Sequence, residues 1–201
     1  MPRWQLHFSL HSVFAMPVFH ALRSSLSTLP RIGLATLLLA SSGQLLAKDW
    51  GVTAGYGTDS TNKVGIIAGW DREQPLWQGE KWHLGLRHEV ELGFWDAKYG
   101  NDIVEFGYSP VLRMIRPLGD HGKRLFVEGS IGVRLISDTS LSPDTNMSTA
   151  FQFSDMLGVG YQWGPKQLNT VGLRGVHISN AGIKKPNDGV EFGLLYYQRK
   201  F

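Results

Sequence analysis

The chain of 201 residues contains no cysteine, which excludes disulfide bridges, thiolate nucleophiles and cysteine-ligated metals. It also lacks an excess of charge in its main part. The formal net charge is +3, but the first 47 residues hold Arg3, Arg23 and Arg31 and no acidic residue. Without these three arginines, the 20 basic residues fall to 17, which balance the 17 acidic residues from Lys48 onward. The balance gives no support to nucleic-acid binding.

The sequence also lacks an apolar run of the roughly twenty residues that a membrane-spanning helix needs. The apolar stretch in "RIGLATLLLASSGQLLAKDW" covers only about nine residues after Arg31 and leads into small and polar residues up to Ala47. It predicts a signal peptide over 1–47, whose removal leaves 48–201. The segment exceeds the usual length of about 15–30 residues, and Leu45 is large for its place before the cleavage point, so a start at Met16 is an alternative. An uncleaved membrane anchor is a further alternative.

From Lys48 onward the hydrophobic residues repeat with a period of two rather than 3.6, which indicates strands. In "KWHLGLRHEVELGFW", one face carries apolar side chains such as Leu84 and Leu92, whereas the other carries Arg87 and Glu89. The segments "DIVEFGYSPVLRM" and "LFVEGSIGVRL" alternate in the same way. This alternation fits a water-soluble barrel with an apolar interior and, equally, a membrane barrel with an apolar exterior.

Three further features favour the membrane barrel. The strands run to about ten or more residues, enough to cross a bilayer at a tilt. Aromatic residues fall near strand ends, as in interfacial girdles, and the chain ends on an aromatic residue, Phe201, like the C-terminal signal of outer-membrane barrels. We therefore predict an all-β protein, an eight-stranded antiparallel transmembrane β-barrel whose narrow interior is filled by side chains. The expected strands are 49–57, 63–72, 81–96, 103–116, 124–137, 149–163, 167–180 and 190–201.

Three polar residues of the last two segments share the lipid-facing side if the alternation is carried through. In the seventh segment this phase reaches His177 and Ser179, and counting back from Phe201 it reaches Glu191. If the hairpin pairs His177 with Glu191, the imidazole can lie between the hydroxyl and the carboxylate, the order that acyl transfer requires. The alternative is three solvated side chains at the barrel rim, where a polar group costs only about 0–1 kcal/mol. The sequence lacks the G-x-S-x-G elbow of α/β-hydrolases.

The run "HISNAGIKKPNDGVE" closely resembles the motif of the outer-membrane lipid A 3-O-deacylases, the PagL family. The arrangement of signal peptide, eight strands and terminal aromatic residue extends the resemblance over the mature chain. It implies a multi-pass barrel in a Gram-negative outer membrane that hydrolyses the ester-linked acyl chain at the 3-position of lipid A in lipopolysaccharide. By this resemblance His177 is the general base, Ser179 the nucleophile and Glu191 the acid that orients the base.

The resemblance also implies residues around this triad. Asn180 through its side chain and Gly182 through its backbone N–H correspond to oxyanion donors, and Asn187 to a supporting residue of the loop. Lys184 and Lys185 could contact the phosphates of lipid A, although a solvated pair of loop charges is the favoured interpretation.

No metal and no cofactor is expected, because the mechanism needs none and His83, His88 and His121 are scattered over different faces or turns. The expected partners are lipopolysaccharide and outer-membrane lipid; a homodimer is left open, because no stripe of residues identifies an interface. Two other functions are left open. An outer-membrane phospholipase would release ordinary fatty acid and lysophospholipid, and a non-catalytic barrel for adhesion or envelope stability would tolerate the loss of His177 or Glu191.

Overall fold

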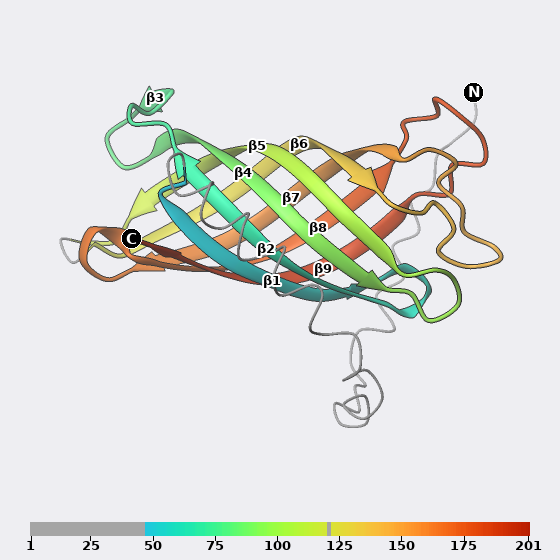
Figure 1. Ribbon diagram of the computed structural model, residues 1–201. Helices are drawn as coiled ribbons and strands as arrows, with labels where there is room; N and C mark the ends of the chain where they lie inside the picture. Colours follow the sequence, from blue (N-terminus) through green and yellow to red (C-terminus); the bar gives the residue numbers. More distant parts are fainter. Residues whose placement is uncertain (1–46, 120–121) are drawn as a thin grey trace, which may run out of the picture. The chain divides into compact units, whose positions relative to one another are not determined.

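The computed structural model describes residues 47–119 and 122–201, which form a closed antiparallel β-barrel (Figure 1). Consecutive long strands pair with each other, and β1 pairs with β9 to close the barrel. The elements are β1 (Asp49–Gly57), η1 (Thr58–Ser60), β2 (Thr61–Asp71), β3 (Trp77–Gln78), β4 (His83–Asp96), β5 (Ile103–Pro117), β6 (Arg124–Ile136), β7 (Phe151–Trp163), η2 (Pro165–Gln167), β8 (Asn169–Ser179) and β9 (Val190–Lys200).

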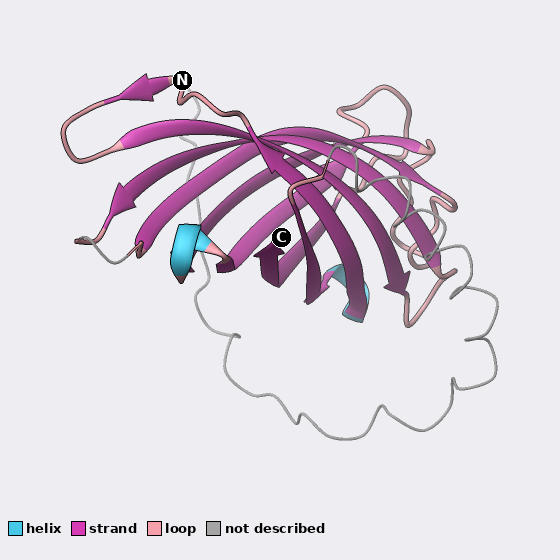
Figure 2. Ribbon diagram, turned by 60° about the vertical axis from the view of Figure 1, so that its left-hand side comes forward, coloured by secondary structure: helices cyan, strands magenta, loops and turns pink. Residues whose placement is uncertain are grey.

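The eight expected strands are confirmed, with ends that differ by no more than two residues from those expected. The exception is β3, a two-residue strand beside the start of β4, which is too short to produce a hydrophobic pattern of its own. Short helical turns lie only between strands (Figure 2), and no described helix is long and apolar enough to span a membrane. The expected signal peptide, up to residue 46, and His121 lie outside the described residues.

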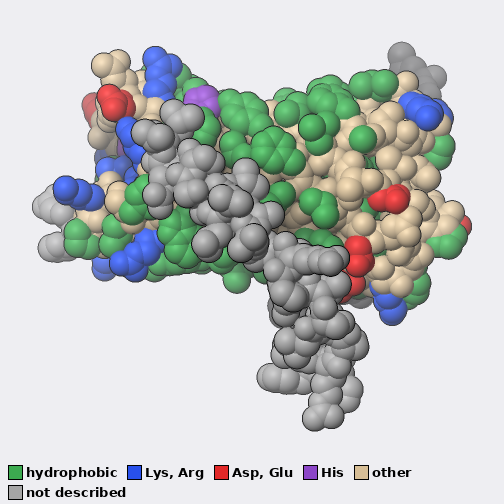
Figure 3. Space-filling model, viewed as in Figure 1, with side chains coloured by type: hydrophobic (Ala, Val, Ile, Leu, Met, Phe, Trp, Pro, Cys, Tyr) green, Lys and Arg blue, Asp and Glu red, His purple; other side chains and the backbone are tan. Residues whose placement is uncertain are grey.

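The outer wall of the barrel is apolar. Leu157 and Ile131 are 76% and 71% exposed, and exposed Val, Leu, Ile and Phe side chains occur on most strands. Figure 3 shows this cover of hydrophobic side chains over the middle of one face, with lysines and arginines gathered at one end. An apolar exterior between polar ends is the arrangement of a transmembrane barrel, so the inverted pattern that the sequence predicts is confirmed.

Half of the barrel interior is filled by a network of buried ion pairs. Arg174 contacts Glu89 through Nη1 and Oε2 at 2.8 Å and Glu128 through Nε and Oε1 at 2.8 Å. Arg113 Nε lies 2.7 Å from Glu128 Oε2, and the Tyr196 hydroxyl donates to Glu128 Oε1 at 2.8 Å. Because each of these charges is removed from water, the network depends on every member having a partner.

The other half of the interior is apolar. Its fully buried side chains include Trp95, Ile178 and Val190, and Leu141 and Met147 from the connection between β6 and β7 cover them at the barrel mouth. This cluster explains why apolar residues of β8 point inward near its end, against the ionic character of the interior elsewhere. The barrel mouth beside the turn between β8 and β9 is therefore closed by packed side chains.

Candidate active site

The hairpin of β8 and β9 brings the three predicted catalytic residues together at the barrel end opposite the C-terminus (Figure 1). His177 pairs with Glu191 across the two strands, the register that the sequence argument required. Ser179 is the last residue of β8 and lies on the same face as His177, two residues away. Side chains at 177 and 191 are 45% and 82% exposed on the outer wall, as the alternation predicts.

His177 and Glu191 face each other at a distance that a small rotation would close. His177 Nδ1 lies 3.9 Å from Glu191 Oε1, which is too long for a hydrogen bond. Catalytic hydrogen bonds are often long without substrate and shorten in the complex. The geometry therefore supplies a carboxylate on the Nδ1 side of the imidazole.

Two neighbours of the triad come from β7 and were not foreseen. Phe153 pairs with Ser179, and Asp155 pairs with His177 from the side opposite Glu191. Asp155 points outward, so His177 lies between Asp155 of β7 and Glu191 of β9 on the outer face of the sheet. The sequence signal for Asp155 is only its outward phase, because the register of β7 against β8 is not visible in the sequence.

Gly189, which precedes β9, lies against the imidazole of His177. Its φ is +68°, and a Cβ atom at this position would lie 2.8 Å from His177 Cε1. Only a residue without a side chain leaves room for the ring here, and the left-handed backbone also favours glycine. The backbone of Gly189 thus limits the positions open to the ring.

The side chain of Asn180 is fully buried and already engaged. Its Nδ2 group donates to the carbonyl of Met147 at 2.8 Å and to the carbonyl of Lys184 at 2.8 Å. An amide group has two hydrogens, so none is left for a substrate. This arrangement disfavours the expected oxyanion donation by the Asn180 side chain and favours a supporting role.

Asn187 and Gly182 lie in the turn that follows Ser179. The Asn180 backbone N–H donates to Asn187 Oδ1 at 2.9 Å, which fixes the orientation of the Asn187 amide. Within the described residues, no acceptor is found for Asn187 Nδ2 or for the backbone N–H of Gly182, whose φ is +80°. Both groups are therefore available as donors in the turn that follows Ser179.

The turn is braced by the connection between β6 and β7. The Asn146 backbone N–H donates to Asp188 Oδ2 at 2.8 Å, and the Asp188 N–H donates back to the Asn146 carbonyl at 3.4 Å. On the other side, the Glu191 N–H donates to Thr58 Oγ1 at 2.9 Å. The sequence argument missed these contacts, because they join segments far apart in the chain.

Lys184 and Lys185 are exposed in the same turn, and neither forms an ion pair with a described carboxylate.

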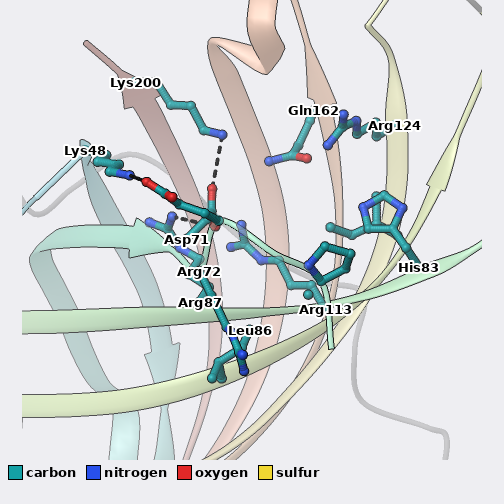
Figure 4. A pocket seen from close by; sticks show the side chains of 14 residues that line it. Lys48, Asp71, Arg72, His83, Leu86, Arg87, Arg113, Arg124, Gln162 and Lys200 are labelled. Atoms are coloured by element: carbon teal, nitrogen blue, oxygen red, sulfur yellow. Dashed lines mark hydrogen bonds and ion pairs between the residues drawn. The ribbon is translucent and has the colours of Figure 1, made fainter. Parts of the chain in front are cut away.

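A cavity of about 310 Å³ lies at the opposite end of the barrel (Figure 4). Ionic side chains line it, among them Asp71 and Lys200. The distance between Lys200 Nζ and Asp71 Oδ2 is 3.1 Å. It contains none of the triad residues, so the candidate chemistry lies on the outer wall and not in this cavity. Across the described parts of the chain, no group of three His, Cys, Asp or Glu side chains is arranged to hold a metal ion.

The chain is similar to known proteins over most of its length. The family model described as lipid A 3-O-deacylase (PagL) matches residues 62–200. The chain is 34% identical to lipid A deacylase PagL of Bordetella bronchiseptica over 179 residues, which cover 86% of this chain and 96% of the relative. It is 31% identical to lipid A deacylase PagL of Pseudomonas aeruginosa over 178 residues, covering 85% and 96%. The crystal structure of the outer membrane enzyme PagL matches with a TM-score of 0.70 and 28% identity, over 76% of this chain and 99% of that chain.

Proposed function

Since this chain belongs to the lipid A 3-O-deacylase (PagL) family, we propose that it hydrolyses the ester that links an acyl chain to the 3-position of lipid A. The observation that carries the proposal is the cross-strand pair of His177 and Glu191, with Ser179 on the same outward face. The products are a 3-hydroxy fatty acid and a lipid A with a free 3-hydroxyl group.

The reaction proceeds through an acyl-enzyme. His177 takes the proton of the Ser179 hydroxyl as Oγ attacks the ester carbonyl, and Glu191 stabilises the imidazolium that forms. The tetrahedral intermediate collapses with cleavage of the ester C–O bond, and His177 protonates the departing sugar oxygen. A water molecule, deprotonated by His177, then attacks the acyl-enzyme and releases the fatty acid and Ser179.

The negative oxygen of the intermediate needs hydrogen-bond donors. The backbone N–H of Gly182 and the Nδ2 group of Asn187 are the candidates, because both lie in the turn after Ser179 and lack another acceptor among the described residues. Each such donor contributes about 2.7–4 kcal/mol to stabilisation of the transition state. Asn180 supports the turn through its hydrogen bonds to the carbonyls of Met147 and Lys184. Lys184 and Lys185 are exposed loop charges, and contact with the phosphates of lipid A is a secondary part of the proposal.

The location on the outer wall suits a substrate that is itself a membrane lipid. Lipid A lies in the outer leaflet, with its ester groups near the interface between headgroups and hydrocarbon. A serine at the end of a membrane-facing strand is reached by lateral diffusion of lipid along the barrel. A soluble ester has no such route to concentrate at this site.

The test is mass spectrometry of lipid A from cells that produce the parent protein or the Ser179→Ala variant. Loss of one 3-hydroxyacyl group with the parent alone is expected. The variant should assemble as a folded barrel, because Ser179 lies at a strand end and is only partly buried. Equal release by both proteins would refute the assignment of Ser179, and lysophospholipid as the product would instead identify a phospholipase.

A further inference from the structure

We propose that the cavity at the C-terminal end of the barrel is a binding site for a small soluble phosphate compound, held by Arg113 and Arg124. This end also carries the short connections between β5 and β6 and between β7 and β8, and short turns of outer-membrane barrels face the periplasm. The site lies at the end of the barrel opposite the candidate catalytic residues. It is therefore independent of the ester chemistry proposed for them.

A glycine keeps space open inside the barrel at this level. Gly85 of β4 lines the cavity and pairs with Arg113 of β5. A Cβ atom at Gly85 would make only ordinary contacts, 3.7 Å from Ile115 Cδ1 and 3.9 Å from the Arg113 carbonyl oxygen. Its φ is not left-handed either. Neither packing nor backbone conformation requires a glycine here, and the missing side chain leaves room beside Arg113.

Arg113 supplies buried donors to this space. The residue is 2% exposed, and its Nε group donates to Glu128 Oε2 at 2.7 Å, whereas the contacts of Nη2 are longer, at 3.4–3.5 Å. No acceptor for Nη1 is found within the described part of the chain. A guanidinium Nη atom carries two hydrogens, and leaving them unpaired in the interior costs free energy. An acceptor in the cavity is therefore favoured.

Arg124 and Gln162 form one wall of the cavity. They pair across β6 and β7, and both line the cavity, where Figure 4 shows them side by side. Gln162 is 3% exposed, and its Nε2 group donates to Thr170 Oγ1 at 3.3 Å, which leaves one amide hydrogen for another acceptor. The wall thus presents a guanidinium and an amide donor next to each other.

The cavity carries more positive than negative charge. Six cationic side chains line it, against two carboxylates. Four of the cations form ion pairs with carboxylates of the lining or of the adjoining interior. The other two, Arg72 and Arg124, form no ion pair with a described carboxylate. Their charge is available to an anion.

A phosphate group fits these donors and this charge. A phosphate monoester carries about −1.5 to −2 charges at pH 7, close to the charge of two arginines, and guanidinium groups bind phosphate oxygens with paired hydrogen bonds. The cavity lies within the barrel wall, whereas membrane lipids contact the outer face. The ligand we infer is therefore a soluble phosphate compound and not a lipid headgroup.

The experiment measures binding of radiolabelled inorganic phosphate by equilibrium dialysis. The purified protein is kept in micelles of an uncharged detergent at fixed ionic strength, and the parent is compared with Arg124→Gln and Gly85→Leu. Lys123→Gln is the matched control, because it removes the same charge from the neighbouring exposed residue, which does not line the cavity. Heat-modifiable mobility on gels confirms that each barrel is folded.

The parent should bind a single phosphate per chain, and Arg124→Gln should weaken binding by about tenfold or more, the loss of one charge-assisted hydrogen bond. Gly85→Leu should weaken it similarly without any change of charge, because the leucine occupies the space. Lys123→Gln should resemble the parent. Equal affinity of the parent, Arg124→Gln and Gly85→Leu, or no saturable binding by the parent, would overturn the site.

Competition identifies the source of the phosphate group. Glycerol 3-phosphate should displace the labelled phosphate, and a short-chain phosphatidylglycerol in the micelles should not. Displacement by the phospholipid alone would show that the site takes a lipid headgroup, and the proposal of a soluble ligand would be wrong.

Discussion

His177 of β8 is held by neighbours from the two adjacent strands and one turn. Glu191 faces Nδ1 from β9, Asp155 pairs with it from β7, and the backbone of Gly189 lies against the ring. None of these contacts is a normal hydrogen bond within the described structure, so the ring is positioned by shape as much as by polar contact. The position of the imidazole is therefore sensitive to small changes in backbone bulk.

Gly189→Ala is expected to lower kcat by about 10²-fold with little change in KM, because the new methyl group displaces the imidazole from Ser179. The variant also carries an alanine in a left-handed conformation, which costs about 1–2 kcal/mol of stability. Steady-state kinetics on lipid A in detergent separates kcat from KM.

Gly119→Ala is the matched control for the backbone cost. Its φ is +67°, almost the +68° of Gly189, and a Cβ atom there would meet no atom of the described residues within 4 Å. The control should lose stability in the same way and keep the parent kcat. If Gly189→Ala also kept the parent kcat, the proposed positioning of His177 by this glycine would be wrong.

Among the elements, the connection between β6 and β7 does most to link the barrel mouth to the site. It covers the apolar cluster with Leu141 and Met147, accepts a hydrogen bond from Asn180 and exchanges two with Asp188. It also reaches η1, where Ser142 Oγ donates to Asp59 Oδ2 at 2.6 Å. The turn that carries the candidate oxyanion donors is therefore supported by a segment with no catalytic residue.

The link to η1 should depend on pH. Hydrogen bonds from Ser142 and Thr145 lower the pKa of the Asp59 carboxyl, so folding favours its ionised form. The resulting stabilisation is present above the ordinary pKa of about 3.9 and is lost as pH falls through the lowered value. Asp138 contributes in the same sense, since the backbone N–H of Ser140 lowers its pKa.

Hydrogen–deuterium exchange of residues 139–147 measures this link. We expect faster exchange in the Asp59→Asn variant than in the parent at pH 7, because the amide is a weaker acceptor than the carboxylate. The two proteins should converge only as pH falls through the lowered pKa of the Asp59 carboxyl, which lies below its ordinary value of about 3.9, once allowance is made for the intrinsic pH dependence of exchange. Identical exchange at pH 7 would show that Asp59 does not hold the connection.

In the molecule as a whole, the two halves of the interior are stabilised differently. The apolar half packs under the barrel mouth, where dispersion and the hydrophobic effect act as in a soluble core. The ionic half consists of arginines and carboxylates that satisfy one another out of contact with water. The apolar side chains of the outer wall stabilise the fold only when lipid surrounds them. Inside the barrel, the ionic network is therefore a main interaction that holds the strands of this half together.

Glu128→Gln is expected to destabilise the barrel by about 3–5 kcal/mol, because it leaves Arg113 and Arg174 short of a buried partner. Glu73→Gln is the control, since its pair with Lys48 is 85% exposed on the glutamate side and such pairs contribute about 0–1 kcal/mol. Urea unfolding in detergent micelles measures both. Equal destabilisation by the two variants would contradict a structural role for the network.

The period of two in the sequence determined the strands and the shared phase of His177, Ser179 and Glu191, because alternation is a local property of extended backbone. Strand length, aromatic residues near strand ends and the terminal Phe201 indicated the inverted barrel. The motif from His177 to Glu191 was also sufficient to indicate the family and its chemistry. The signal peptide stays a prediction, and the catalytic roles stay proposals.

Only the tertiary structure decided the register between strands outside the last hairpin, and with it most of the contacts around the site. The pairing of Asp155 with His177, the pairing of Arg124 with Gln162 and the bond from Asn180 to Met147 each depend on register or on loops that are distant in the chain. The inward apolar residues of β8 near the site broke the simple pattern for the same reason. What fills the interior at each level is set by side chains from all eight strands together, and no single strand carries that information.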